Sequence, residues 1–176
     1  MPEESPRRSE LITELVSQLR TSNAYSVMVS QAAADHIGIN TTDLHSLNIL
    51  AFSDHELSAG ELATTIGLTT ASVTGVIDRL EHAGLVRRIR DPLDRRRVVV
   101  RLIPEAARER VAPVFASLLA EWEAELGKYS ERELDLILEF QRRTLDIMRG
   151  QVALLRKGTL PAADRLPSSA IMDSHP

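Results

Sequence analysis

Residues 59–78 read AGELATTIGLTTASVTGVID, and this stretch predicts a helix-turn-helix. Two helices that cross at a steep angle need a small residue where they approach most closely, and Ala63 supplies it. Gly67 lies at the turn, where a positive φ costs little only for glycine. Val73 fills the corner from the second helix. The other positions expected on the inward face are Leu62, Ile66, Leu68 and Val76.

The second helix of this motif also has a polar face. It carries Thr69, Thr70, Ser72, Thr74, Asp78 and Arg79, which are expected to point away from the core. A helix that reads DNA carries its base-contacting side chains on such a face. Thr69 has a second expected role as the cap of the helix, and Asp78 is better suited to an internal ion pair than to reading a base.

Length and composition exclude several classes of protein. The 176 residues suit one domain or two small lobes that share a core. The chain has no cysteine, which excludes a disulfide scaffold, a thiolate zinc site and a cysteine redox switch. No apolar run approaches the roughly 20 residues that span a membrane. The start, MPEES, lacks the basic and apolar regions of a signal peptide. We therefore expect a soluble cytoplasmic protein with no membrane partner.

Charge is distributed unevenly along the chain. The formal net charge is -4, yet residues 69–101 hold eight arginines and four acids and so carry +4. The rest of the chain carries -8. A basic module on an acidic body can steer one face of the protein toward phosphate.

Capping signals and hydrophobic spacing divide the chain into segments. We expect a flexible N-terminus over 1–8, a dimerisation helix over 9–38, a DNA-binding lobe over 39–103, two further dimerisation helices over 104–157 and a flexible tail over 158–176. Ser5-Pro6 could instead open the first helix, and Thr41-Thr42-Asp43 is expected to start the second. Ser58-x-x-Glu61 and Ser130-x-x-Glu133 are capping boxes. Pro113 should kink the helix that contains it.

Two stretches rich in Val and Ile follow the helix-turn-helix, at residues 85–90 and 95–103. The intervening Asp91-Pro92-Leu93-Asp94 favours a turn, because proline fixes φ at the second turn position. This pattern predicts a two-stranded β-hairpin wing. The predicted fold class is therefore mainly α, with a winged helix-turn-helix lobe. Its long terminal helices have too little protein to cover them, so they are expected to form a dimerisation lobe with a second copy.

This order of elements, with a wing that reads DPLDRRR, resembles the MarR (multiple antibiotic resistance regulator) family of transcription factors. The likeness covers roughly residues 8–157. It implies a homodimeric regulator, expected to be a repressor of a pseudo-palindromic operator that a small ligand relieves. The expected partners are double-stranded DNA, a second copy and a small aromatic or phenolic effector, with no cofactor.

The resemblance also implies which residues contact DNA. Hydroxyls of the second helix can reach bases and phosphates, small residues permit close approach, and Arg79 can reach a phosphate or a guanine. Family wings insert an arginine into the minor groove, and the matching position is Arg96. Arg95 and Arg97 would touch phosphates or the hairpin itself, while Asp91 and Asp94 would stabilise the wing, Asp94 by pairing with a neighbouring arginine. The full set of candidate DNA contacts is Thr69, Thr70, Ala71, Ser72, Thr74, Gly75, Arg79, Arg95, Arg96 and Arg97.

An effector site is less visible in the sequence. In such proteins an inducer sits between the dimerisation helices and the DNA-binding lobe, although residues there are also ordinary core residues. The candidates are Tyr25, Met28, Ala32, His45, Phe52, Val111, Phe115 and Trp122. The five histidines show no helical metal-site spacing, so no metal is expected.

Two other functions compete with DNA-binding regulation. A winged helix can serve as a protein–protein interaction module, which would tolerate loss of the wing arginines. An enzyme is remote, because the sequence has no nucleophile elbow, no phosphate-binding loop and no carboxylate cluster.

Overall fold

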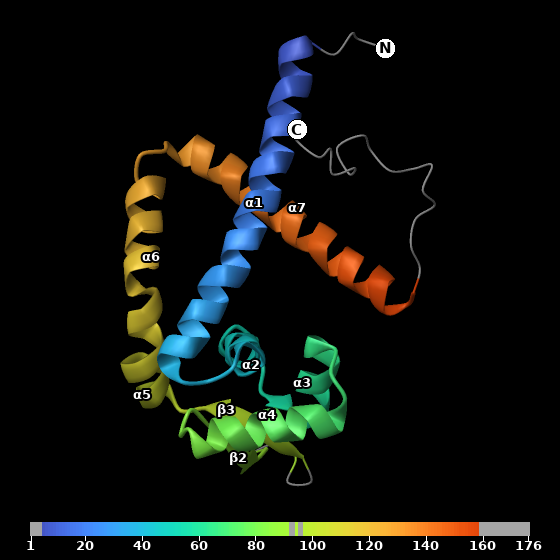
Figure 1. Ribbon diagram of the computed structural model, residues 1–176, viewed down its shortest axis with the longest axis vertical. Helices are drawn as coiled ribbons and strands as arrows, with labels where there is room; N and C mark the ends of the chain where they lie inside the picture. The colour runs from blue at the N-terminus through green and yellow to red at the C-terminus, as the bar shows by residue number, and fades with distance from the viewer. Residues whose placement is uncertain (1–4, 92–93, 95–96, 159–176) are drawn as a thin grey trace. The chain divides into compact units, whose positions relative to one another are not determined.

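The computed structural model describes residues 5–91, 94 and 97–158, and the chain divides into two units (Figure 1). The central unit comprises residues 18–120, and the terminal unit comprises residues 1–17 and 121–176. The wing-tip residues Arg95 and Arg96 lie outside the described residues. So do residues 1–4 and 159–176, where the flexible ends were expected.

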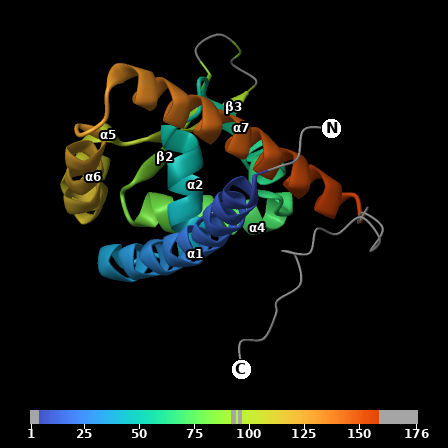
Figure 2. The ribbon, with the colours of Figure 1, turned by 90° about the horizontal axis from the view of Figure 1, so that it is seen from above.

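Three short helices and a small sheet make up much of the central unit (Figures 1 and 2). The helices are α2 (Thr41–Ala51), α3 (Ala59–Ile66) and α4 (Thr70–His82). The strands are β1 (Leu57–Ser58), β2 (Val86–Arg90) and β3 (Val98–Leu102), in the order β1-β3-β2. The hairpin predicted from the sequence is β2-β3, whose antiparallel register pairs Arg88 with Val100. Strand β1 pairs with β3 as a third strand of the sheet. It has only two residues, which are too few to show a strand pattern in the sequence.

The core of this unit joins the helix-turn-helix to the sheet. Most of its fully buried members come from α2, α3, α4 and β2, and they include Leu44, Leu62, Val73, Ile77, Leu80 and Val86. Leu85, in the turn between α4 and β2, is also fully buried. The expected inward face is correct for Leu62, Ala63, Val73 and Val76, with Ile66 partly buried. The prediction is wrong for Leu68, which is 36% exposed. It follows the left-handed turn at Gly67 and precedes the cap of α4, so it lies on neither helical face.

Caps and turns lie where the sequence indicated. Ser58 and Glu61 form the capping box of α3, with the Ser58 backbone N–H donating to Glu61 Oε2 at 2.7 Å. Gly67 has φ +81° and ends α3. Thr69 Oγ1 accepts from the Ser72 backbone N–H at 3.1 Å and so caps α4. These interactions span four residues or fewer, so local sequence suffices to predict them.

Helix α2 begins at Thr41, as predicted, but its cap is not a threonine. Its N-cap is Asn40, whose side-chain oxygen accepts from the Asp43 backbone N–H at 2.8 Å. Thr41 instead donates its hydroxyl to the Gln31 side chain. The Asp43 carboxylate, in the first turn of α2, is buried.

Four further α-helices lie in the described chain. They are α1 (Pro6–Ile37), α5 (Pro104–Ala106), α6 (Ala112–Leu126) and α7 (Glu131–Arg156). Helix α1 begins at Pro6, so residues 6–8 are helical rather than part of a flexible end, as the fixed φ of proline favours at a first helical position. Ser130 and Glu133 cap α7 as predicted.

A π-helical turn, η1 (Ala107–Val111), joins α5 to α6 ahead of Pro113. The Ala112 N–H donates to the Ala107 carbonyl, five residues back. In a regular α-helix, Pro113 would lack a donor for the carbonyl of residue 109 and its ring would clash with that carbonyl. The feature that the sequence predicted as a kink at Pro113 therefore appears as a wider turn just before it.

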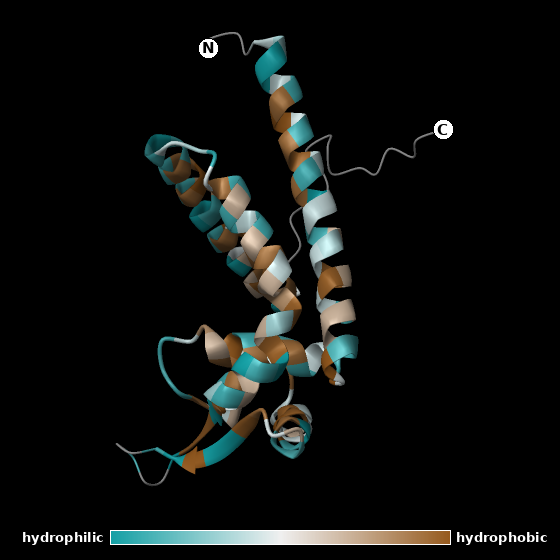
Figure 3. Cartoon of the chain, turned by 90° about the vertical axis from the view of Figure 1, so that its left-hand side faces the viewer, coloured by the Kyte–Doolittle hydropathy of each residue, from teal (hydrophilic) through white to brown (hydrophobic). Residues whose placement is uncertain are grey.

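Hydrophobic residues recur along the long helices (brown in Figure 3), and many of their side chains are exposed. Those of α1 include Leu15, Tyr25, Val27 and Met28, and those of α7 include Leu136, Ile147 and Leu155. Most of the buried core residues come from the short helices and the sheet instead. The long helices therefore leave apolar surface uncovered in a single copy.

Candidate nucleic-acid interface

Helix α4 presents small polar side chains to solvent. Thr70, Ala71, Ser72 and Thr74 are all exposed, and Gly75 is half-buried. Their hydroxyls are oriented by local hydrogen bonds: Thr74 Oγ1 donates to the Thr70 carbonyl at 2.9 Å, and Thr69 Oγ1 lies 2.8 Å from Ser72 Oγ. Because a hydroxyl oxygen keeps lone pairs after donating, this face can still accept hydrogen bonds from a ligand.

Arg79, predicted to reach DNA, is held by α2. Its Nε donates to Asp43 Oδ2 at 2.9 Å and its Nη2 to Asp43 Oδ1 at 2.6 Å. The Asp43 side chain is 2% exposed and that of Arg79 is 52% exposed. The hydrogen bonds with Asp43 raise the pKa of Arg79. Two of its five donors are therefore committed within the protein, and Nη1 lies toward Gly75 on the α4 face.

A second ion-pair cluster joins α4 to β2. Arg88 Nη2 donates to Asp78 Oδ1 at 2.7 Å, and the Arg88 backbone N–H donates to Glu81 Oε1 at 2.7 Å. The Arg88 guanidinium also contacts the Glu81 carboxylate. The prediction that Asp78 serves an internal ion pair is therefore confirmed.

The base of the wing is closed by contacts between Asp91 and Arg97. The Asp91 N–H donates to the Arg97 carbonyl at 2.9 Å, and Arg97 Nη1 donates to Asp91 Oδ2 at 2.8 Å. Asp94 contributes through its backbone: its carbonyl accepts from the Arg97 N–H at 2.9 Å, and its N–H donates to Asp91 Oδ1 at 3.4 Å. Within this turn, Arg97 thus forms its ion pair with the Asp91 carboxylate.

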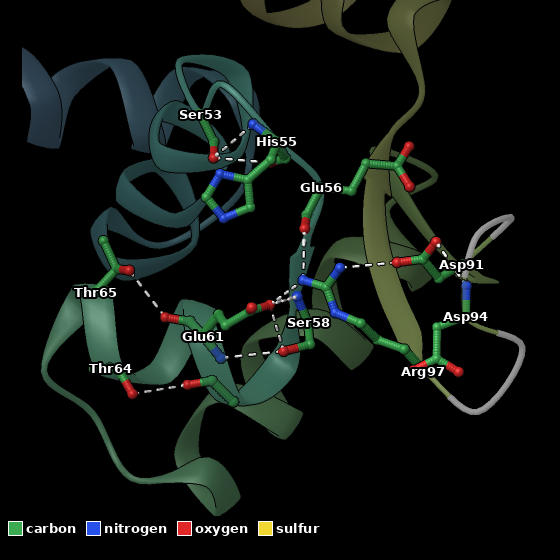
Figure 4. A network of polar contacts seen from close by, with 11 residues as sticks. Ser53, His55, Glu56, Ser58, Glu61, Thr64, Thr65, Asp91, Asp94 and Arg97 are labelled. Atoms are coloured by element: carbon green, nitrogen blue, oxygen red, sulfur yellow. Dashed lines mark hydrogen bonds and ion pairs between the residues drawn. The ribbon is translucent and has the colours of Figure 1, made fainter.

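Arg97 also reaches beyond the wing (Figure 4). Its Nη2 donates to the Glu56 carbonyl at 2.9 Å and to Glu61 Oε2 at 2.5 Å. Hydrogen bonds from the Ser58 backbone N–H and hydroxyl, followed by that from Arg97, lower the pKa of Glu61 to about 2. Two roles were predicted for Arg97: contact with a phosphate, or support of the hairpin. The contacts described here are those expected for support of the hairpin.

The eight candidate effector residues differ in how far they are buried. Phe52 is 85% exposed, and Tyr25, Met28 and His45 are also exposed. Val111 and Phe115 pack partly buried against the core, while Trp122 belongs to the terminal unit. Only Ala32 lines the cavity of about 350 Å³ between α1 and α6, with Val29, Ala33, His36 and Val114.

Metal-binding and membrane-spanning features are absent from the described residues. Within residues 5–91, 94 and 97–158, no group of three or more His, Asp or Glu side chains could hold a metal ion. In the same part of the chain, no helix has the length and apolarity needed to cross a membrane.

A three-helix cluster with a left-handed glycine turn, an exposed polar second helix and a strand-borne wing defines a winged helix-turn-helix protein. The MarR family model matches residues 39–98. The chain is 39% identical over 151 residues to YcgE, an uncharacterized HTH-type transcriptional regulator of Bacillus subtilis, covering 85% of this chain and 96% of YcgE. The chain belongs to the MarR family, whose members are transcriptional regulators with a DNA-binding winged-helix fold and are not enzymes.

Solved structures agree on the fold. A MarR family protein from Bacillus stearothermophilus superposes with a TM-score of 0.61 at 23% identity, covering 80% of this chain and 97% of that one. A point mutant of S. aureus MepR bound to an oligodeoxyribonucleotide gives a TM-score of 0.50 at 20% identity, covering 76% and 97% of the two chains.

Proposed function

We propose that this protein is a homodimeric repressor that binds a pseudo-palindromic DNA operator and is released from it by a small ligand. The observation that carries the proposal is the exposed hydroxyl-bearing face of α4 beside a wing rich in arginine. The related fold of MepR, solved with an oligodeoxyribonucleotide, supports the same use of this surface.

Dimerisation is supported by the apolar side chains that α1 and α7 expose in a single copy. Uncovered apolar surface of this kind is characteristic of an interface, and most homo-oligomers close through a two-fold axis. Such an axis would direct two α4 helices into successive major grooves, about 34 to 36 Å apart. The operator would then repeat its sequence as an inverted half-site.

The proposed DNA contacts fall into two groups. Thr70, Ser72 and Thr74 would meet base edges and phosphates in the major groove, with Ala71 and Gly75 permitting close approach. Arg96, at the wing tip, would enter the minor groove, where a narrow groove concentrates negative potential. Arg95 would contact a nearby phosphate. Thr69 contributes mainly as the cap of α4.

Repression follows from occupancy. A dimer that covers two successive major grooves excludes another protein from the same DNA, which makes repression the simplest outcome of binding. The proposed effector is a small aromatic or phenolic compound. The cavity beside Ala32, between α1 and α6, is the site we propose for this compound.

The test has two stages. Duplexes that bind are selected from a random-sequence pool, and the affinity of the purified protein for the selected duplex is measured by fluorescence anisotropy at several salt concentrations. The affinity should fall steeply with salt, with a logarithmic slope of about -0.9 per phosphate neutralised. Replacing Arg96 by alanine should weaken binding by roughly 1 to 3 kcal/mol.

Small aromatic acids are then screened for release of the selected duplex. A monomer in solution, or a chain that binds no duplex at low ionic strength, would refute the proposal. Retained partner capture by a variant with Arg95, Arg96 and Arg97 all replaced by alanine would favour a protein-interaction module instead.

A further inference from the structure

We propose that Arg97 is a positioning residue: it clamps the wing to the first turn of α3 and does not itself contact DNA. The inference rests on the proposed DNA binding and deepens it, because it separates the wing arginines by role. The clamp consists of Arg97, Asp91, Glu61 and the Glu56 carbonyl (Figure 4).

The Arg97 guanidinium is largely occupied by these groups. Nη1 donates to Asp91 Oδ2, and Nη2 divides its hydrogens between the Glu56 carbonyl and Glu61 Oε2. The three acceptors come from three places in the chain: the wing, the residue before β1, and α3. One side chain therefore fixes the wing base to two elements outside it.

The net charge around Arg97 argues against an additional contact between Arg97 and a DNA phosphate. Arg97 contributes one positive charge and faces two carboxylates, so the clamp as a whole carries a formal net charge of about -1. The Arg97 side chain is 31% exposed and that of Asp91 is 11% exposed. If the guanidinium turned toward a phosphate, the nearly buried Asp91 carboxylate would lose its ion pair with Arg97, which is unfavourable.

Arg90 offers a contrast on the same hairpin. It lies exposed on β2 and forms no ion pair with any residue of the described chain. An arginine in this condition is available to a phosphate, and its loss would act through charge alone. Arg90 is therefore the matched control for Arg97.

The clamp sets the relation between two DNA-reading elements. Glu61 lies in the first turn of α3, and α3 leads through the Gly67 turn into α4. The wing is thus attached to the same helix pair that presents α4. Arg97 would keep the distance between major-groove and minor-groove contacts fixed, which bears on sequence specificity more than on general affinity.

The two roles for Arg97 predict opposite results when Glu61 is changed. If Arg97 binds phosphate, removing a nearby carboxylate frees it and lowers repulsion, so binding should be unchanged or tighter. If Arg97 is a clamp, removing its partner should weaken binding to a specific sequence. Glu61→Gln is suited to this test because glutamine at this position can maintain a capping box.

The experiment uses the full chain, the selected duplex and a random-sequence duplex. Glu61→Gln should lower affinity for the selected duplex by about threefold, because a neutral acceptor is roughly half as strong as a charged one. Glu61→Lys should lower it by about tenfold, although it adds positive charge. Neither should weaken binding to the random duplex. Arg97→Gln combined with Glu61→Gln should cost less than the two effects summed.

Arg90→Gln should weaken binding to both duplexes by the same factor and reduce the salt slope by about one. The same behaviour from Arg97→Gln, together with tighter binding by Glu61→Gln, would overturn the clamp and make Arg97 a phosphate contact. Thermal unfolding of each variant establishes that the fold is retained.

A measurement without DNA separates this inference from the proposed function. The Asp91 and Arg97 backbone amides are hydrogen-bonded at the wing base, so their hydrogen exchange reports its closure. Exchange at both should accelerate in Glu61→Gln but not in Arg90→Gln. Unchanged exchange would refute the clamp even if the protein bound DNA. Faster exchange in a protein that binds no duplex would refute only the proposed function.

Discussion

The ion pair between Asp43 and Arg79 provides a direct test of what holds α4 in place. Arg79→Met removes the guanidinium while keeping much of the apolar length of the side chain. The Asp43 carboxylate, 2% exposed, would then lose both of the hydrogen bonds, at 2.9 and 2.6 Å, that it receives from Arg79. The expected result is a loss of folding stability rather than a local change at the surface.

The loss of folding stability expected for Arg79→Met lies between two limits. Breaking a fully buried pair costs about 3 to 5 kcal/mol, and an exposed pair contributes about 0 to 1 kcal/mol. Arg79 is 52% exposed, so water screens the guanidinium but not the buried carboxylate. We expect Arg79→Met to lower the free energy of unfolding by about 2 to 3 kcal/mol, which moves a urea midpoint by roughly 1 M or more.

Urea unfolding followed by circular dichroism measures this loss, and two companion variants locate its cause. Asp43→Asn keeps an acceptor oxygen and should cost about 1 kcal/mol. Asp43→Leu combined with Arg79→Met removes both charges and should recover much of the stability. A cost below about 0.5 kcal/mol for Arg79→Met, as at an ordinary surface position, would refute the reasoning.

Three further predictions concern α3 and its caps. Gly67→Ala should cost about 1 to 2 kcal/mol in urea unfolding, because φ at Gly67 is +81°, whereas the control Gly60→Ala, in open space within α3, should be neutral or stabilising. Ser58→Ala should cost about 1 kcal/mol in the same assay, and an unchanged midpoint would contradict the role of the capping box. The pKa of Glu61 is lowered to about 2, so the stability it contributes is present above pH 4.5 and is lost as pH falls toward 2. An NMR titration of the Glu61 carboxyl should show this pKa, and Glu61→Gln should flatten the pH dependence of unfolding in that range.

Features that depend on neighbouring residues could be predicted from the sequence. The Ser58 capping box, the Gly67 turn and the Thr69 cap each join residues no more than four positions apart. Their side-chain chemistry and spacing suffice to specify them. The run of apolar residues within 98–102 likewise located a strand of the wing.

Contacts between distant residues could not be predicted in the same way. The Arg79–Asp43 and Arg97–Glu61 pairs each join residues 36 positions apart. Arginines on a polar helix face or a wing have the same local pattern whether they meet DNA or an acid of the same chain. The partner becomes identifiable only when the fold brings α2 to α4, or the wing to α3.

The candidate effector residues illustrate a further limit. Tyr25, Met28 and Phe52 share an apolar or aromatic character that suits a binding pocket, yet they are exposed in the single chain. Apolar or aromatic character alone does not distinguish a residue that lines a pocket from one that packs against another protein. The same ambiguity applies to the exposed apolar residues of α7.

The π-helical turn at 107–111 has a consequence for how α6 tolerates change. A turn with one extra residue rotates everything after it by about 100° relative to an uninterrupted α-helix. Deleting a single residue from this segment would therefore restore regular winding and swing Phe115 and Leu118 onto a different azimuth. The number of residues in 107–111 therefore determines which residues of α6 face the core. Substitutions within 107–111 should be tolerated far more readily than the deletion of one residue from it.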